Sequence, residues 1–193
     1  MTEQLLVPLD DYLKVGLHIG NKYKTADMAP FIYKVRPDGL PVLNVEDINK
    51  RLVLAINMMK NYKPDEILVV CRRENGWKAV KLFSKLTSVS VFAGRYPPGI
   101  LTNSDLEEFM EVKLIIVVDS GPDKNAVEDA SRLGIPVIAF CDTNNEAKNT
   151  DLVVPCNNKG KKSLGLLFWV MAKEYVKHLG LDFKYKVDDF VLE

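Results

Sequence analysis

The chain has 193 residues, with 26 basic and 26 acidic side chains, so its formal net charge is +0. Hydrophobic residues make up 47% and charged residues 27%, which excludes collagen-like, low-complexity and fully disordered classes. This length predicts one domain over residues 1–193. The balanced charge argues against a protein that coats nucleic acid through a global positive field, but it does not exclude a localised basic face.

The first elements expected along the chain are a small hairpin and a long helix. Apolar runs at residues 31–35 and 41–45 flank Arg36-Pro37-Asp38-Gly39, whose proline and glycine suit a type I turn. An amphipathic helix is predicted over residues 46–62, because apolar residues recur on one helical face. Pro64 should end it, since proline cannot donate a helical hydrogen bond.

Short apolar runs then alternate with helical patterns. Strands are predicted at 67–71, 89–93, 114–118, 137–141 and 152–154, and helices at 76–86, 124–133 and 163–179. Uninterrupted apolar strands separated by helices are typical of a mainly parallel sheet that is covered on both faces. The predicted fold is therefore a three-layer, doubly wound α/β domain with a small N-terminal hairpin. Residues 181–193 lose this periodicity and are expected to form a flexible or partner-binding tail.

Signals for membrane insertion and disulfides are weak. The longest nearly continuous apolar stretch, residues 164–172, is far shorter than the ~20 residues that span a bilayer, and the start of the chain does not resemble a signal peptide. Cys71, Cys141 and Cys156 are widely spaced and form no CxxC pair, which argues against a disulfide framework or a zinc site. We expect a soluble protein of a reducing compartment, with buried cysteines and no bound metal.

The motifs of common enzyme classes are incomplete. No G-x-G-x-x-G turn for a dinucleotide is present. Residues 157–163 resemble a phosphate loop, but Pro155 replaces its earlier glycine and Lys162 stands where Ser or Thr would bind magnesium. Neither His18 nor His178 has an evident nucleophile or carboxylate partner for catalysis. We therefore assign no catalytic residue or cofactor and expect no small-molecule substrate.

One enzymatic alternative stays open. Asp119, Asp142 and Lys159 follow three different predicted strands, and ligands of doubly wound folds bind at the carboxyl ends of strands. These residues could surround the strand-end site of a phosphate- or nucleotide-binding α/β enzyme. The competing interpretation is that both aspartates accept hydrogen bonds from their own loops.

Positive charge is concentrated in particular loops. The segment before and within the hairpin carries Lys22, Lys24, Lys34 and Arg36 together with two tyrosines, a mixture that suits phosphate contact and base stacking as well as a solvated loop. Lys159, Lys161 and Lys162 precede or begin the last helix, where the helix dipole also attracts anions. Arg95 lies in a proline-rich loop. We interpret these eight residues as candidate contacts to RNA phosphates, with His18 and Asn21 shaping the first RNA-facing loop.

Several blocks, in the same order along the chain, resemble one family. They are residues 12–20 with the core His18-Ile19-Gly20, 31–39, 42–45, 94–99, 101–103, 126–139, 141–144 and 157–164. The chain is identified on these blocks, over about residues 10–180, as similar to the universal second protein of the small ribosomal subunit. The similarity is to the archaeal and eukaryotic form, the family of ribosomal protein SA (the laminin-receptor precursor). The long coiled-coil insertion of bacterial members and the extended acidic eukaryotic tail are absent, so the archaeal type fits best.

The resemblance implies a flavodoxin-like sheet and a structural, non-catalytic role on the cytoplasmic ribosome. Its implied partners are small-subunit rRNA near the head–body junction and other small-subunit ribosomal proteins. The sequence departs from the family at Asp119-Ser120-Gly121-Pro122, a longer loop than the usual Asp-Pro, so the family's contacts are not transferred to that loop.

Overall fold

The computed structural model describes residues 5–191, so the ends of the predicted domain and of the predicted tail, residues 1–4 and 192–193, lie outside the described residues. Its centre is a five-stranded parallel sheet in the order β4-β3-β5-β6-β7. The strands are β3 (Ile67–Cys71), β4 (Ser90–Ala93), β5 (Leu114–Val117), β6 (Val137–Cys141) and β7 (Leu152–Pro155). The chain passes from β4 at one edge across β3 to β5, so the direction of winding reverses between β3 and β5. This confirms the predicted doubly wound α/β fold and places its topological switch point at the ends of these two strands.

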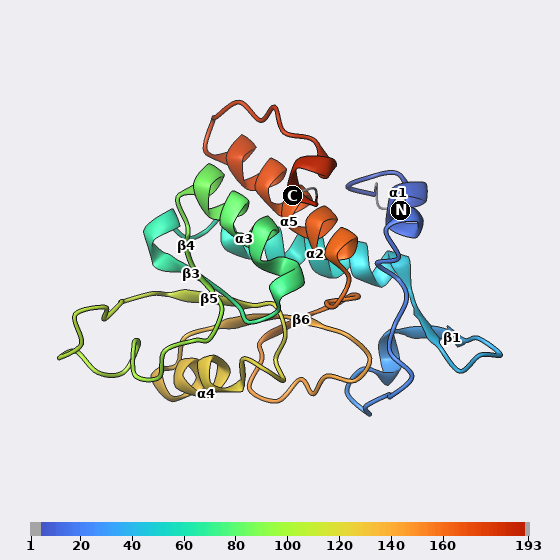
Figure 1. Ribbon diagram of the computed structural model, residues 1–193, viewed down its shortest axis with the longest axis horizontal. Coiled ribbons are helices and arrows are strands. Elements are labelled where there is room, and N and C mark those ends of the chain that lie inside the picture. Colours follow the sequence, from blue (N-terminus) through green and yellow to red (C-terminus); the bar gives the residue numbers. More distant parts are fainter. Residues whose placement is uncertain (1–4, 192–193) are drawn as a thin grey trace.

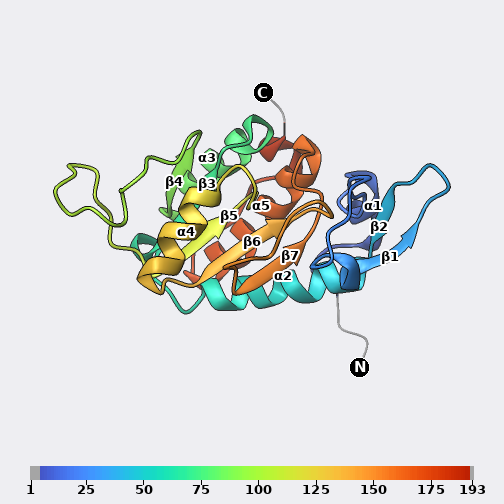
Figure 2. The ribbon, with the colours of Figure 1, turned by 90° about the horizontal axis from the view of Figure 1, so that it is seen from below.

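Helices cover the sheet unequally on its two faces. Three helices, α2 (Val45–Met59), α3 (Glu74–Thr87) and α5 (Lys161–His178), lie on one face, and α4 (Lys124–Leu133) lies on the other (Figures 1 and 2). The alternation of side chains along β3 shows why both faces are covered. Val69 belongs to the larger core under α2, α3 and α5, whereas its neighbours Leu68 and Val70 belong to the smaller core under α4. A strand that is apolar on both faces must be buried on both.

The crossovers on the α4 face are partly loops instead of helices. Residues 94–113 join β4 to β5, and Tyr96, Ile100 and Val112 from this connection pack into the smaller core. These side chains cover the apolar face of the sheet that a helix would cover if the crossover were helical. Its charged tip projects from the end of the molecule near β4 (Figure 2).

The predicted helices are present, with ends shifted by their caps. Asn44 accepts a hydrogen bond from Glu46 N (3.1 Å) and starts α2. This helix ends at Met59, three residues before its predicted end, because the chain turns at Asn61 and Tyr62 and then extends at Lys63 before Pro64. Gly134 adopts φ +69° and ends α4 where the sequence predicted a C-terminal cap.

The N-terminal segment packs beside the sheet. The predicted hairpin is confirmed by the antiparallel strands β1 (Ile32–Val35) and β2 (Pro41–Leu43), preceded by a short 3₁₀ turn, η1 (Ala29–Phe31). A short helix, α1 (Leu9–Lys14), was not predicted. It is fixed by Tyr12, which is fully buried and donates a hydrogen bond to Asn49 Oδ1 of α2 (3.1 Å).

The C-terminal segment folds back over α5. A 3₁₀ turn, η3 (Val187–Phe190), places the buried Phe190 side chain in the larger core. A Cβ atom on Gly165 would lie 2.4 Å from Val191 Cγ2, so a larger residue in α5 at this close approach would displace the Val191 side chain. The flexible or partner-binding role of the tail stays a prediction.

Candidate nucleic-acid interface

The first basic loop, residues 20–27, is attached to the loop that follows β6. Asn21 N donates to Asp142 Oδ1 (3.0 Å) and to Thr143 Oγ1 (2.8 Å), and this hydroxyl donates in turn to Asn21 O (2.8 Å). Thr25 N donates to Thr143 O (2.9 Å). A Cβ atom on Gly20 would lie 2.5 Å from Thr143 Cγ2, so only glycine permits this approach. These contacts fix the path of the loop without using its charged side chains.

Lys22, Tyr23 and Lys24 are exposed at the tip of this loop, and the Tyr23 side chain is 79% exposed. Asn21 Oδ1 accepts a hydrogen bond from Tyr23 N (3.2 Å), which holds the turn. The arrangement presents two cations and an aromatic ring on a braced backbone. Such a surface can contact phosphates and stack on an unpaired base.

His18 contributes mainly through its backbone. Its carbonyl accepts a hydrogen bond from Leu43 N (2.8 Å) and so joins the segment before the first basic loop to β2. The imidazole Nδ1 is buried and has no hydrogen-bond partner among residues 5–191. Burial lowers the pKa of His18, which favours the neutral ring.

Lys34 and Arg36 are exposed on the hairpin, which projects from one end of the molecule (Figure 1). Arg36 Nη2 lies 3.3 Å from Asp38 Oδ2 in the hairpin turn, so part of its charge is balanced locally. Tyr33 is 70% exposed, and Lys34 Nζ lies 6.0 Å from the centre of its ring. The hairpin therefore repeats the combination of cation and exposed aromatic ring found in the first basic loop.

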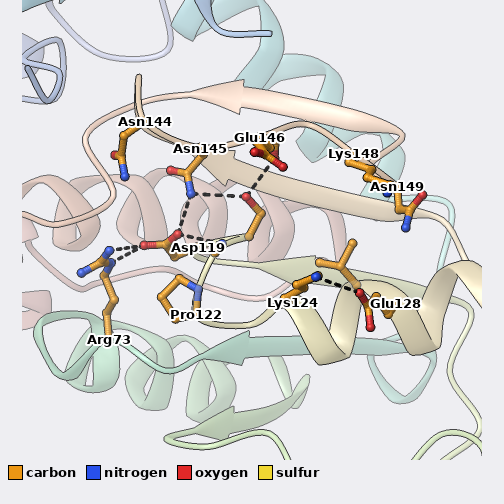
Figure 3. Close-up of a pocket in the computed structure, with 13 residues that line it drawn as sticks. Arg73, Asp119, Pro122, Lys124, Glu128, Asn144, Asn145, Glu146, Lys148 and Asn149 are labelled. Atoms are coloured by element: carbon orange, nitrogen blue, oxygen red, sulfur yellow. Dashed lines mark hydrogen bonds and ion pairs between the residues drawn. The ribbon is translucent and has the colours of Figure 1, made fainter. Parts of the chain in front are cut away.

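A buried polar network lies at the carboxyl ends of β5, β6 and β7 (Figure 3). Asp119, which is 1% exposed, accepts from Arg73 through two guanidinium nitrogens and from Asn145 Nδ2 (2.7 Å). Asn145 Oδ1 accepts from Asp142 N (2.8 Å) and Asn158 Nδ2 (3.1 Å). One asparagine side chain thus connects the loops after three strands. Sequence reasoning missed Asn145 and Asn158, although amides among the polar residues after apolar strands were a usable signal.

Lys159 belongs to this network. Its Nζ lies 3.0 Å from Asp142 Oδ2 and donates to Asn144 Oδ1 (2.6 Å). The aspartates also behave as loop acceptors: Asp119 Oδ1 accepts from Gly121 N (3.1 Å) and Asp142 Oδ1 from Thr143 N (2.6 Å). This is the hydrogen bonding that was expected if these carboxylates stabilise their own loops.

A pocket of about 380 Å³ opens at the switch point beside this network (Figure 3). Asp119 lines it, but Asp142 and Lys159 do not, so the three residues of the enzymatic alternative do not surround one cavity. Lys124 and Glu128, which also line it, pair with each other at 3.3 Å. Within residues 5–191, no group of three or more His, Cys, Asp or Glu side chains is arranged to hold a metal ion.

Two further groups of predicted contact residues, Arg95 and the pair Lys161 and Lys162, follow the carboxyl ends of strands of the sheet. Arg95 is exposed after β4, beside Arg72 and the buried Asp123, in a second pocket of about 220 Å³. Asp123 Oδ2 accepts from Arg72 N (3.1 Å), Oδ1 has no partner among residues 5–191, and burial raises the pKa of Asp123 to about 6. In the first turn of α5, Lys162 is exposed and Lys161 is half-buried.

The three cysteines are free and buried, as expected. Burial raises the pKa of Cys71 and of Cys141 to about 12, so these thiols stay protonated and are poor nucleophiles. Within residues 5–191, no helix combines the length and apolar character needed to cross a bilayer.

Comparison with known proteins supports the resemblance. The family model described as "Ribosomal protein S2" matches residues 12–112 and 107–177. The small ribosomal subunit protein uS2 of Thermoplasma acidophilum is 42% identical over 195 residues, which cover 98% of each chain. The uS2 protein of Nanoarchaeum equitans is 46% identical over 176 residues, covering 91% of this chain and 88% of the relative. For Haloquadratum walsbyi uS2 the identity is 44%, covering 98% of this chain and 68% of the relative. The chain therefore belongs to the ribosomal protein S2 family, in its archaeal form.

Proposed function

We propose that this protein is a structural constituent of the small ribosomal subunit, which acts in translation by binding small-subunit rRNA and neighbouring ribosomal proteins and has no catalytic role. The observation that carries the proposal is similarity along nearly the whole chain to archaeal proteins named as small ribosomal subunit proteins. The polar side chains at the carboxyl ends of β5, β6 and β7 support a role without catalysis, because they are largely hydrogen-bonded to one another. The place of action that follows is the ribosome in the cytoplasm.

The proposed RNA contacts are cations of the first basic loop, the hairpin, the loop after β4 and the first turn of α5, and all are exposed except Lys161, which is half-buried. They are Lys22, Lys24, Lys34, Arg36, Arg95, Lys161 and Lys162. Lys22 and Lys24 have the strongest support, because the hydrogen bonds of Asn21 and Thr143 order their loop before RNA arrives. A loop that is ordered in advance pays less conformational entropy on binding.

Lys159 needs a different role within the proposal. Its ammonium group is engaged with Asp142 and Asn144 and is only partly exposed, so a phosphate would have to compete with a buried carboxylate. We infer that Lys159 positions the loops that follow β6 and β7. His18 and Asn21 act similarly on the first basic loop, through backbone and turn hydrogen bonds.

The test compares two double variants that each remove two positive charges. Lys22→Gln/Lys24→Gln alters the proposed contacts, and Lys63→Gln/Lys177→Gln alters exposed lysines near the opposite edge of the sheet. Each phosphate contact contributes about 0.7 to 0.9 to the slope of log K against log salt concentration. For binding to small-subunit rRNA, the first variant should lower the magnitude of this slope by about 1.4 to 1.8, and the control should leave it unchanged. Equal slopes for the two variants would contradict the assignment of this loop.

A further inference from the structure

A second basic surface lies on the outer face of α3. The helix packs against the sheet and α5 through Gly76, Ala79, Val80 and Phe83, which are buried. Its opposite face borders a shallow groove of about 530 Å³. The lining is Glu74, Asn75, Trp77, Lys78, Lys81, Leu82 and Lys85 from α3, with Lys161 from the first turn of α5. Lys78, Lys81 and Lys85 lie inside an amphipathic helix and not in a loop, so the groove was not predicted from the sequence.

Positive charge exceeds negative charge in the lining of the groove. Lys78, Lys81 and Lys85 form no ion pair within the described chain. Other lysines of the protein do, as in the contact of Lys113 with Glu66 (2.6 Å). Among residues 5–191, Glu74 is the only carboxylate that lines the groove. A row of uncompensated cations repels itself and is relieved by an external anion.

The spacing of the lysines suits a polymeric anion. At 1.5 Å per residue, Lys78 and Lys85 are separated by about 10.5 Å along the helix axis, with Lys81 between them. Flexible lysine stems over this distance can reach successive phosphates of one strand. The groove also contains an aromatic ring: Lys81 Nζ lies 6.0 Å from the centre of the Trp77 indole, whose Nε1 is buried without a partner among residues 5–191.

The groove is continuous with a segment already proposed to contact RNA. Asn75 Nδ2 donates to Lys159 O (2.8 Å), which ties the start of α3 to the loop before α5, and the two helices lie side by side (Figure 1). In the first turn of α5, Lys161 and Lys162 stand at the positive end of the helix dipole, and no acidic residue is present there. An anion bound beside Lys162, which is exposed, would offset the unfavourable position of a positive charge at this end of the helix.

We propose that the α3 groove binds the phosphate backbone of an rRNA segment that continues from the N-terminus of α5. This inference rests on the proposed function and extends it to Lys78, Lys81 and Lys85. Charge complementarity and the continuity with α5 favour RNA as the occupant. An acidic segment of a neighbouring protein would compete for the same lysines, and the experiment separates the two.

The test uses Lys81→Gln/Lys85→Gln, in which both lysines are exposed, with Lys63→Gln/Lys177→Gln as the charge-matched control. Binding to protein-free small-subunit rRNA is measured from 50 to 300 mM salt, and folding is checked by circular dichroism. The α3 variant should lower the magnitude of the salt slope by about 1.4 to 1.8. Lys81→Arg/Lys85→Arg should restore the wild-type slope, because it restores the charge.

Trp77 gives an independent readout. The chain contains two tryptophans, so a Trp169→Phe background leaves Trp77 as the single reporter. Its emission should change on titration with rRNA in this background, and the change should be smaller when Lys81 and Lys85 are replaced by Gln.

Three other outcomes would contradict the inference, and each would do so for a different reason. If the Lys22/Lys24 variant loses salt slope and the α3 variant does not, the groove does not bind RNA and the proposed function stands. If the α3 variant binds rRNA with the wild-type slope but fails to enter assembled subunits, the partner is a protein. If the wild-type chain binds no small-subunit rRNA, both the inference and the proposed function fail.

Discussion

The substitution Thr143→Val tests whether the first basic loop is braced by the β6 loop. Valine keeps the shape of the side chain, so its packing against Gly20 is retained. It removes the hydroxyl that accepts from Asn21 N (2.8 Å) and donates to Asn21 O (2.8 Å). Asn21 N keeps its bond to Asp142 Oδ1, but the carbonyl loses its donor in a partly buried position.

An unsatisfied group of this kind costs about 1 to 3 kcal/mol. At about 2 to 4 °C per kcal/mol for a protein of this size, a loss of about 2 kcal/mol should lower the Tm by about 4 to 8 °C. The variant should also bind rRNA about 3- to 10-fold more weakly, a cost of about 0.7 to 1.4 kcal/mol, because Lys22 and Lys24 lose their ordered backbone. Its salt slope should stay at the wild-type value, since no charge is removed.

Differential scanning fluorimetry and rRNA titrations at several salt concentrations measure these quantities. Thr102→Val, at an exposed threonine, is the matched control and should change the stability by less than about 0.5 kcal/mol. A Thr143→Val protein with the wild-type Tm and rRNA affinity would refute the bracing of this loop.

Three further substitutions test other parts of the structure. Burial raises the pKa of Asp123 to about 6, above its unfolded value of about 3.9, so ionisation of this carboxyl destabilises the fold as the pH rises from about 4 to 6. Asp123→Asn should therefore add about 2 to 3 kcal/mol to the free energy of unfolding at pH 7.5 and almost nothing at pH 3.5. A gain in stability that is independent of pH would contradict this. Arg73→Gln should lower the free energy of unfolding, measured with urea, by about 2 to 3 kcal/mol. This is less than the roughly 3 to 5 kcal/mol expected when a fully buried ion pair is broken, because the Arg73 side chain is 31% exposed. An unchanged unfolding midpoint would show that the Asp119 carboxylate does not need its cation. Phe190→Ala should loosen the packing of the C-terminal segment on α5 near Gly165 and accelerate proteolysis within residues 181–191. Cleavage at the wild-type rate would mean that the Phe190 side chain does not hold this segment in place.

The parallel sheet was predictable because its signal is local. Each strand is a short apolar run, and the alternation with helical patterns determines the architecture without knowledge of any contact. The cap at Gly134 was predictable for the same reason, since one residue type at one position determines it. Helix α1 was missed because six residues give little periodicity, and its stability comes from the Tyr12 hydrogen bond to Asn49, which is distant in sequence.

The candidate interface was only partly predictable. Exposed cations in loops, such as Lys22 and Lys24, can be recognised from composition alone. The ion pair of Lys159 with Asp142 could not be, because it joins loops after two different strands. The lysines of α3 resembled the ordinary solvated face of an amphipathic helix, and the excess of positive charge in the groove becomes visible only when the neighbouring elements are placed.

The central claim is that this chain is an RNA-binding constituent of the small ribosomal subunit, and sedimentation tests it most directly. A tagged chain, expressed in an archaeal cell, is followed through a sucrose gradient at low and high salt. It should travel with the small subunit at low salt and be released at high salt, as expected for binding through phosphate contacts. A chain that stays in the soluble fraction at both salt concentrations would contradict the account.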